Sequence, residues 1–151
     1  MPTEQEIKKH IKQEYIESAR NPLHFFKKFC YIQHPTRGRI LFNTYPFQDQ
    51  TFKLLTRDQN SIILKSRQMG ISTLVAAYIL WLMNFHQDKN ILCVATTQNT
   101  AKNLVQKVIF MYENLPSWLK VDYDESNKLG LTLKNGSKVK AVSSSSDSAR
   151  S

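Results

Sequence analysis

The alternation of apolar and polar positions predicts a helix in the first twenty residues. Ile7, Ile11 and Tyr15 recur at helical spacing, so they fall on one face, and the other face is basic. Thr3 followed by Glu6 is the capping-box pattern that starts many helices. We therefore predict an amphipathic helix that begins at this pair.

Turn signals and aromatic residues characterise the next part of the chain. Asn21 and Pro22 are typical of the N-cap and first position of a second, shorter helix. A turn at Gly38 precedes a short extended piece at residues 40–42, and another helix is predicted to begin near Phe47.

Two short apolar runs are each followed by a helical pattern. Residues 61–65 and 90–97 are rich in β-branched residues, as buried parallel strands are. Residues 72–85 are apolar and free of Gly and Pro, and residues 98–115 carry an apolar stripe at helical spacing. Two strand–helix units in succession predict an α/β fold with a mostly parallel sheet covered by helices.

The C-terminal part changes to a strictly alternating pattern. Asn135-Gly136 between two alternating runs predicts a β-hairpin. Residues 143–151 are expected to form an exposed polar loop, and no further buried strand follows, so the sheet is expected to be incomplete at this end. The acidic residues between positions 122 and 125 are expected in a polar surface loop, without a catalytic role.

Composition adds limits and one open question. A length of 151 residues suits one domain or a fragment of one, and 41% hydrophobic residues indicate a folded core. The 21 Lys and Arg residues outnumber 12 Asp and Glu, which gives a net charge of +9. A polyanionic partner and a solvated basic surface explain this excess equally well.

Cysteine and apolar content restrict the cellular setting. Cys30 and Cys93 cannot form a disulfide framework, and no Cys and His spacing typical of zinc sites is present, which fits a reducing compartment. The longest apolar stretch, residues 74–83, is far shorter than the roughly 20 residues that span a bilayer. We expect no membrane segment.

The loop before the predicted helix at residues 72–85 resembles a phosphate-binding loop in part. When the pattern Gly, four residues, Gly, Lys, Ser or Thr is aligned on Gly70, Lys65 replaces the first Gly and Ile71 replaces the Lys. Ser72 fills the hydroxyl position. A strand, a short loop and a helix N-terminus in this order suit phosphate binding. The residues expected around the phosphates are Lys65, Ser66, Arg67, Gln68, Met69, Gly70, Ile71, Ser72 and Thr73.

The missing lysine needs a replacement if the loop binds phosphate. Lys65 and Arg67 are the long cationic side chains close enough to reach the β- and γ-phosphates. A purely structural alternative has equal weight for the loop alone: Lys65 would cap a strand, Arg67 would pair with a surface acid and Ser72 would be a helix N-cap. Gln48, upstream of the loop, has an amide that could pair with the adenine edge, and it shifts the balance toward nucleotide binding.

The order of four segments resembles a known family. Residues 21–48, 63–74, 91–108 and 133–151 together resemble the ATPase domain of the large terminase subunit of tailed phages, of the T4-like kind. The resemblance implies a P-loop NTPase fold of the ASCE, RecA-like type, with ATP and Mg²⁺ as cofactors. It implies that Gln48 reads adenine and that Ser72 binds Mg²⁺.

The resemblance also assigns roles to the two cations and to a second motif. Arg67 matches the loop arginine proposed in the family to act on the γ-phosphate. T4-like members carry a lysine where this chain has Ile71, and Lys65 instead fits the lambda-like type, in which the lysine stands at the start of the loop. Lys65 and Arg67 are thus the expected catalytic residues. Residues 96–98, Thr-Thr-Gln, resemble the motif that couples nucleotide state to DNA.

The resemblance divides the chain into residues 1–44, an N-terminal helical segment, and residues 45–151, a partial ATPase domain. The Asp-Glu strand end (Walker B), the separate coupling motif that follows it in the family, and the nuclease domain are missing from these 151 residues. The chain alone is therefore expected to be a weak or inactive ATPase.

Cellular partners follow from the resemblance alone. It implies double-stranded DNA, the portal protein and the small terminase subunit as partners, and a homo-oligomeric ring on the procapsid. The protein would work in the host cytoplasm as a motor that hydrolyses ATP to package DNA, and would not be a structural part of the virion.

Two other functions remain open on the sequence. A helicase-like or restriction-type DNA translocase would share the same core. A non-catalytic interaction module with a decayed nucleotide site would explain the isoleucine at position 71 and would use the basic surface for docking.

Overall fold

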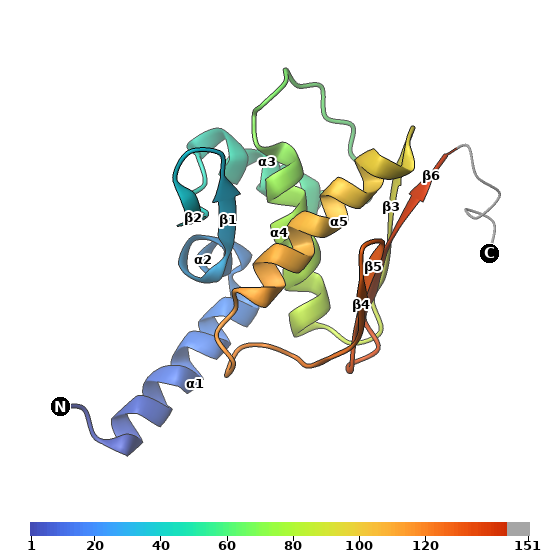
Figure 1. The fold of residues 1–151 in the computed structure, drawn as a ribbon. Helices are drawn as coiled ribbons and strands as arrows, with labels where there is room; N and C mark the ends of the chain where they lie inside the picture. Colours follow the sequence, from blue (N-terminus) through green and yellow to red (C-terminus); the bar gives the residue numbers. More distant parts are fainter. Residues whose placement is uncertain (145–151) are drawn as a thin grey trace.

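The computed structural model describes residues 1–144, which fold into helices and strands (Figure 1). The elements are α1 (Glu4–Arg20), α2 (Pro22–Phe29), β1 (Tyr31–His34), β2 (Gly38–Leu41), α3 (Pro46–Arg57), α4 (Ile71–Phe85), β3 (Asn90–Ala95), α5 (Gln98–Glu113), β4 (Tyr123–Asn127), β5 (Gly130–Leu133) and β6 (Lys138–Ser143). From residue 145 onward, the polar loop predicted at 143–151 lies outside the described residues.

The caps predicted for α1 and α2 are confirmed. The Thr3 hydroxyl accepts from the Glu6 N–H (3.3 Å), and the Glu6 carboxylate accepts from the Thr3 N–H (2.6 Å). The Asn21 side chain accepts from the His24 N–H (3.2 Å) at the start of α2. Each cap satisfies backbone donors that a helix leaves open, which explains why both helices begin where local sequence chemistry places them.

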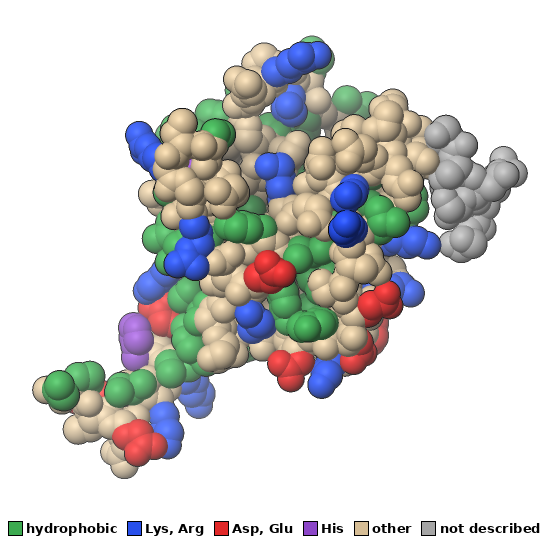
Figure 2. Space-filling model, in the orientation of Figure 1, with side chains coloured by type: hydrophobic (Ala, Val, Ile, Leu, Met, Phe, Trp, Pro, Cys, Tyr) green, Lys and Arg blue, Asp and Glu red, His purple; other side chains and the backbone are tan. Residues whose placement is uncertain are grey.

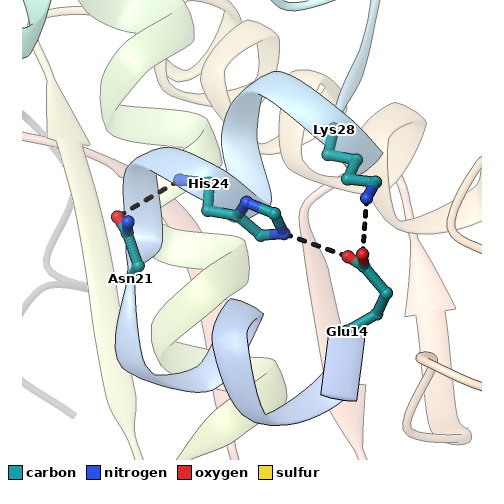
Figure 3. Close-up of polar contacts among 4 residues, drawn as sticks. All are labelled: Glu14, Asn21, His24 and Lys28. Carbon is teal, nitrogen blue, oxygen red and sulfur yellow. Dashed lines mark hydrogen bonds and ion pairs between the residues drawn. The ribbon is translucent and has the colours of Figure 1, made fainter. Parts of the chain in front are cut away.

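A charged cluster joins α1 to α2 (Figure 3). The Glu14 carboxylate contacts the His24 ring nitrogen Nε2 (3.0 Å) and accepts from Lys28 Nζ (2.5 Å). The hydrogen bond from Lys28 holds the pKa of Glu14 below its ordinary value, although partial burial opposes this. The indole N–H of Trp81 donates to the Ser18 carbonyl (2.9 Å), so α1 is also attached to α4.

The larger sheet is mixed, with strand order β3-β6-β5-β4. β3 and β6 are parallel, whereas β5 is antiparallel to both β4 and β6. The α/β class is correct, but the predicted mostly parallel sheet is wrong for residues 1–144. The acidic segment expected as a loop forms β4, which is exposed and pairs with β5 at the sheet edge. Its polar composition concealed a strand because an edge strand with two solvated faces needs no apolar alternation.

The predicted hairpin at Asn135-Gly136 is confirmed and is anchored to the end of α4. Gly136 has φ +84°, a conformation that glycine adopts without strain. The Asn135 amide donates to the Met83 carbonyl (2.8 Å), and the Ser137 hydroxyl donates to the His86 carbonyl (2.8 Å). The turn therefore supplies the partners that the last turn of α4 lacks within the helix.

The core is built around α4 and α5: α5 packs against β3, β5 and β6 of the larger sheet, and α4 packs against α5 and against α2 and α3 (Figure 1). Leu74, Leu80 and Met83 of α4 are completely buried, as its apolar, glycine-free sequence predicts. Asn84 is buried in the same helix and is fully used: its amide N–H donates to the Leu119 carbonyl (2.9 Å) and its oxygen accepts from the Val121 N–H (3.1 Å).

The predicted strand at residues 61–65 is wrong. This segment has no regular secondary structure and projects as part of the loop between α3 and α4 (Figure 1). Ile62 is 101% exposed and Leu64 is 100% exposed. A strand needs a neighbour for its backbone groups, and no strand among residues 1–144 pairs with this segment.

A smaller sheet was only partly predicted. The extended piece expected at 40–42 corresponds to β2, and its antiparallel partner β1 was not predicted. The two strands form a hairpin with the register Tyr31↔Leu41 and His34↔Gly38. This hairpin is separate from the larger sheet, and it forms one wall of the groove described below.

Candidate functional site

The loop before α4 is turned by two residues in left-handed conformations. Gln68 has φ 61° and Gly70 has φ 69°. Gly70 is the N-cap of α4, so the alternative in which Ser72 is the N-cap is wrong. No side chain caps this end of α4. Its first N–H groups are therefore available to an anion, which is the property that helix N-termini offer to phosphate.

Gln48 connects this loop to the start of α3. Its side chain is 2% exposed; the oxygen accepts from the Tyr45 N–H (2.9 Å) and Nε2 donates to the Met69 carbonyl (3.0 Å). A Cβ at Gly70 would lie 2.5 Å from Gln48 Nε2, so the contact requires glycine there. The adenine-reading role of Gln48 stays a prediction. Any ligand would have to share an amide that already makes two hydrogen bonds.

The charge on Asp49 fixes the first turn of α3 beside Gln48. Asp49 accepts from Lys27 Nζ (2.7 Å) and from the Thr44 hydroxyl. Partial burial favours the neutral acid, but these two hydrogen bonds outweigh it and leave the pKa of Asp49 below its ordinary value. The ion pair with Lys27 attaches the first turn of α3, which carries Gln48, to α2.

Lys65 and Arg67 lie on the exposed part of the loop. Lys and Arg side chains are visible on the loop that projects from the molecule in Figure 2. Lys65 Nζ donates to the carbonyl of its neighbour Ser66 (3.3 Å), and neither cation forms an ion pair with another residue of the described chain. The alternative that pairs Arg67 with a surface acid is therefore wrong within residues 1–144. Both cations are available to an anionic ligand.

A groove of about 540 Å³ lies between the loop and the β1–β2 hairpin. It brings together five of the predicted binding residues, namely Gln48, Gln68, Met69, Gly70 and Thr73. The other five predicted residues, Lys65, Ser66, Arg67, Ile71 and Ser72, do not line it. The groove thus collects the residues expected near the base and the start of α4, with the two cations outside it.

The groove also contains residues that sequence reasoning missed. His34 and Arg37 come from the hairpin, and Tyr45 and Phe47 lie beside Gln48. The two aromatic rings are stacked, with centroids 5.8 Å apart and planes 7° apart, and both are exposed. A flat exposed aromatic pair can stack on a purine. The aromatic residues on either side of Pro46 were a usable sequence signal, whereas the hairpin residues gave none.

Ile71 and Ser72 occupy different environments at the start of α4. Ile71 is 7% exposed and belongs to the hydrophobic core. Its side chain therefore cannot be exchanged for lysine without burying a charge. Ser72 is exposed in the first turn, and Thr73 is half-buried. The Ser72 hydroxyl is the group that could take a metal ion beside a bound phosphate, and its Mg²⁺ role stays a prediction.

The segment that resembles a coupling motif lies at the junction of β3 and α5. Thr97 is the N-cap of α5, where its hydroxyl accepts from the Thr100 N–H (3.2 Å), and Thr96 and Gln98 are exposed beside it. This junction and the loop before α4 lie at the same end of the molecule (Figure 1). A structural cap accounts for Thr97 without a ligand.

Residues 1–144 contain no group of three or more His, Cys, Asp or Glu side chains placed to hold a metal ion. In the same residues no helix has both the length and the apolar character needed to cross a bilayer.

Comparison with known protein families gives one match. The family model described as "Terminase large subunit, T4likevirus-type, N-terminal" matches residues 62–151, which is more than half of the chain. The match includes the loop before α4, both core helices and the larger sheet. Gln48, the stacked aromatic pair and the β1–β2 hairpin lie before the matched range.

Proposed function

Because the chain belongs to the T4-like family of large terminase subunits, the DNA-packaging terminases of bacteriophages, we propose that it binds ATP·Mg²⁺ for a packaging motor. The motor would hydrolyse ATP to move double-stranded DNA into a procapsid, in a ring of subunits that contacts the portal protein and the small terminase subunit. This proposal includes a P-loop NTPase fold of the ASCE, RecA-like type for residues 45–151, preceded by a helical segment at 1–44, and action in the host cytoplasm.

The uncapped N-terminus of α4 is the observation that carries the proposal. The open N–H groups and the left-handed Gly70 suit a phosphate. Lys65 and Arg67, on the same loop, have no ion-pair partners in residues 1–144 and could neutralise a triphosphate. The adjoining groove, with its amide and stacked rings, is large enough for a base and ribose.

The proposed chemistry assigns a separate role to each polar group of the loop. Lys65 would bind the β- and γ-phosphates, Arg67 would stabilise charge on the γ-phosphate, and Ser72 would bind Mg²⁺. Catalysis of phosphoryl transfer rests on such positioning and charge stabilisation, with an acidic group to orient the attacking water. The acidic residues of β4 lie at the far edge of the sheet, so we assign them no part in it.

Calorimetric titration with ATP·Mg²⁺ tests this proposal on the chain itself. Lys65→Ala should weaken ATP binding by about ten- to a hundredfold, the loss expected for one charge-assisted hydrogen bond. Arg67→Ala should keep binding within a few-fold, because the role proposed for Arg67 concerns the transition state of hydrolysis. Lys9→Ala, which removes a lysine from the exposed face of α1, is the matched control for the change in net charge.

One outcome would count against the role of Lys65, and another would count against ATP binding as such. The Lys65 role is lost if Lys65→Ala and Lys9→Ala bind ATP equally well. If the unchanged chain binds no ATP at millimolar concentration, the second candidate, a non-catalytic module with a decayed site, takes its place. The buried Ile71 favours that candidate, because it fills the position where T4-like loops carry their lysine.

A further inference from the structure

The groove beside the loop before α4 contains two kinds of group that could bind a base, and they differ in accessibility. Gln48 is 2% exposed, whereas the rings of Tyr45 and Phe47 are 64% and 38% exposed. All three residues line the groove. Whether the base meets the amide or the rings decides whether the site can distinguish adenine from guanine.

Both ends of the Gln48 amide are engaged inside the protein. The oxygen accepts from the Tyr45 N–H (2.9 Å), and Nε2 donates to the Met69 carbonyl (3.0 Å). Gly70 lies so close to Nε2 that a Cβ on it would be 2.5 Å away. To read adenine, the amide would have to accept from N6 and donate to N7 at the same time. In this conformation the buried side chain has no free edge for those two bonds.

The stacked rings of Tyr45 and Phe47 offer the base a different contact. Their centroids are 5.8 Å apart and their planes are 7° from parallel. Pro46, the first residue of α3, stands between them in the chain and restricts the backbone that carries them. Stacking on an aromatic ring tolerates any base, because every base has a π-face. The larger ring system of a purine overlaps more of the aromatic surface than a pyrimidine does.

The exposed polar side chains of the groove do not select one base either. Arg37, Asn43 and Gln68 line the groove, and their side chains make no hydrogen bond or ion pair within residues 1–144. Selective reading of a base edge needs donors and acceptors that are held in position. A side chain that turns freely can follow the edge of either purine, so these three residues leave the preference to stacking.

On the basis of the proposed nucleotide site, we infer that it accepts purine nucleoside triphosphates in general, with the base held by stacking on Tyr45 and Phe47. Gln48 is then a positioning residue, which holds the loop backbone at Met69 and does not contact the base. A good pair of hydrogen bonds to a base edge discriminates by roughly five- to a hundredfold. Without such a pair, the dissociation constants of ATP and GTP should agree within about threefold.

Calorimetric titration of the complete 151-residue chain with the Mg²⁺ complexes of ATP, GTP, CTP and tripolyphosphate tests this inference. ATP and GTP should bind about equally, CTP more weakly and tripolyphosphate most weakly. Tyr45→Ala should weaken ATP and GTP binding by about fivefold or more and leave tripolyphosphate binding unchanged. Tyr45→Phe keeps the ring and is the matched control, with binding expected within about twofold of the unchanged chain. Thermal unfolding establishes that both variants are folded.

Gln48→Glu separates reading of the base from positioning of the loop. The new carboxylate cannot donate to the Met69 carbonyl, so the loop loses a contact that is independent of the base. ATP and GTP should therefore weaken by the same factor. If Gln48 read adenine, the lost donor to N7 would weaken ATP binding much more than GTP binding.

Three results would overturn the inference while ATP binding itself stands. These are ATP binding more than about tenfold tighter than GTP binding, a Gln48→Glu loss confined to ATP, or equal binding of ATP and tripolyphosphate. Failure of all four ligands to bind at millimolar concentration is a different result. It would remove the proposed function together with the inference that depends on it.

Discussion

The turn at Asn135-Gly136 and the loop at residues 58–70 are both irregular connections, yet they differ in how their polar groups are satisfied. In the turn, Asn135 and Ser137 bond to carbonyls at the end of α4. In the loop, Gln48 reaches the Met69 carbonyl, while Ile62 and Leu64 are fully exposed. An irregular connection takes one defined conformation when its polar groups bond to backbone groups that a neighbouring helix or strand leaves without partners.

The same comparison explains why two apolar runs have different fates. β6 contains Val139 and Val142, and residues 61–65 contain Ile62 and Ile63, so both segments have the β-branched residues that favour strands. β6 lies between β3 and β5 and has pairing partners on both edges. The segment 61–65 has no strand paired with it within residues 1–144, so strand propensity alone leaves it irregular and exposed. Substitutions made in both regions test this contrast.

The largest effect is expected from one substitution made in both regions. Leu133→Ala in β5 removes a completely buried side chain and should lower the free energy of unfolding by about 2–5 kcal/mol. Leu64→Ala, the same change at a fully exposed position, should stay within about 0.5 kcal/mol. Denaturant unfolding measures both. A loss of more than 2 kcal/mol at Leu64 would show that residues 61–65 are buried in solution, as the sequence pattern predicts.

A somewhat smaller loss is expected where a buried side chain serves two backbone groups. Asn84→Ala leaves the Leu119 carbonyl and the Val121 N–H without their partner and should cost about 2–4 kcal/mol. Asn99→Ala, at an exposed position in the first turn of α5, is the control and should cost less than about 0.5 kcal/mol. Equal melting temperatures for the two variants would mean that water replaces Asn84.

Alanine substitutions at two glycines distinguish the cost of backbone strain from the cost of a steric collision. Gly136 and Gly38 have φ +84° and +69°, so alanine is strained at both by about 1 kcal/mol. A Cβ at Gly136 would also collide with the Asp88 carboxylate, whereas nothing lies within 4 Å at Gly38. Gly136→Ala should therefore destabilise the protein by about 2 kcal/mol and Gly38→Ala by about half as much. The reverse order in thermal unfolding would contradict the packing of the turn against Asp88.

The smallest effect concerns the Glu14 cluster, which is intermediate between the two regions in exposure. Lys28 lowers the pKa of Glu14, so the folded state favours the carboxylate. The stabilisation is complete above the unfolded-state pKa and disappears as the pH falls through the lower, folded-state pKa. Unfolding at neutral pH should be easier for Glu14→Gln by about 0.2–1 kcal/mol. This difference should shrink as the pH falls below about 5; a difference that grows in acid would refute the assignment.

Local chemistry was sufficient to predict part of the fold. The caps at Thr3 and Asn21, the turn at Gly136 and the helices α4 and α5 depend on neighbours in sequence. The strands β1 and β4 were not predicted because their pairing depends on distant or weakly patterned partners. The same limit explains the failed strand at residues 61–65.

The site was predictable in composition and less so in arrangement. The loop pattern identified the residues at the start of α4, and the cations at Lys65 and Arg67 followed from the isoleucine at position 71. Sequence alone could not show that Ile71 belongs to the core. Nor could it show that the amide of Gln48 is occupied by the loop backbone, since both facts depend on contacts between separate elements.

The bond between Gln48 and Met69 couples the conformation of the loop to the hydrogen bonding of a buried amide. If the peptide plane at Met69 turns, the carbonyl leaves Gln48 and a buried amide loses its acceptor, a cost of about 1–3 kcal/mol. Small excursions return to the same bond, and larger ones need a replacement acceptor. A ligand that presents an acceptor to Gln48 would replace the Met69 carbonyl and stabilise the loop with this bond broken. Binding in the groove would then change the geometry of the α4 N-terminus.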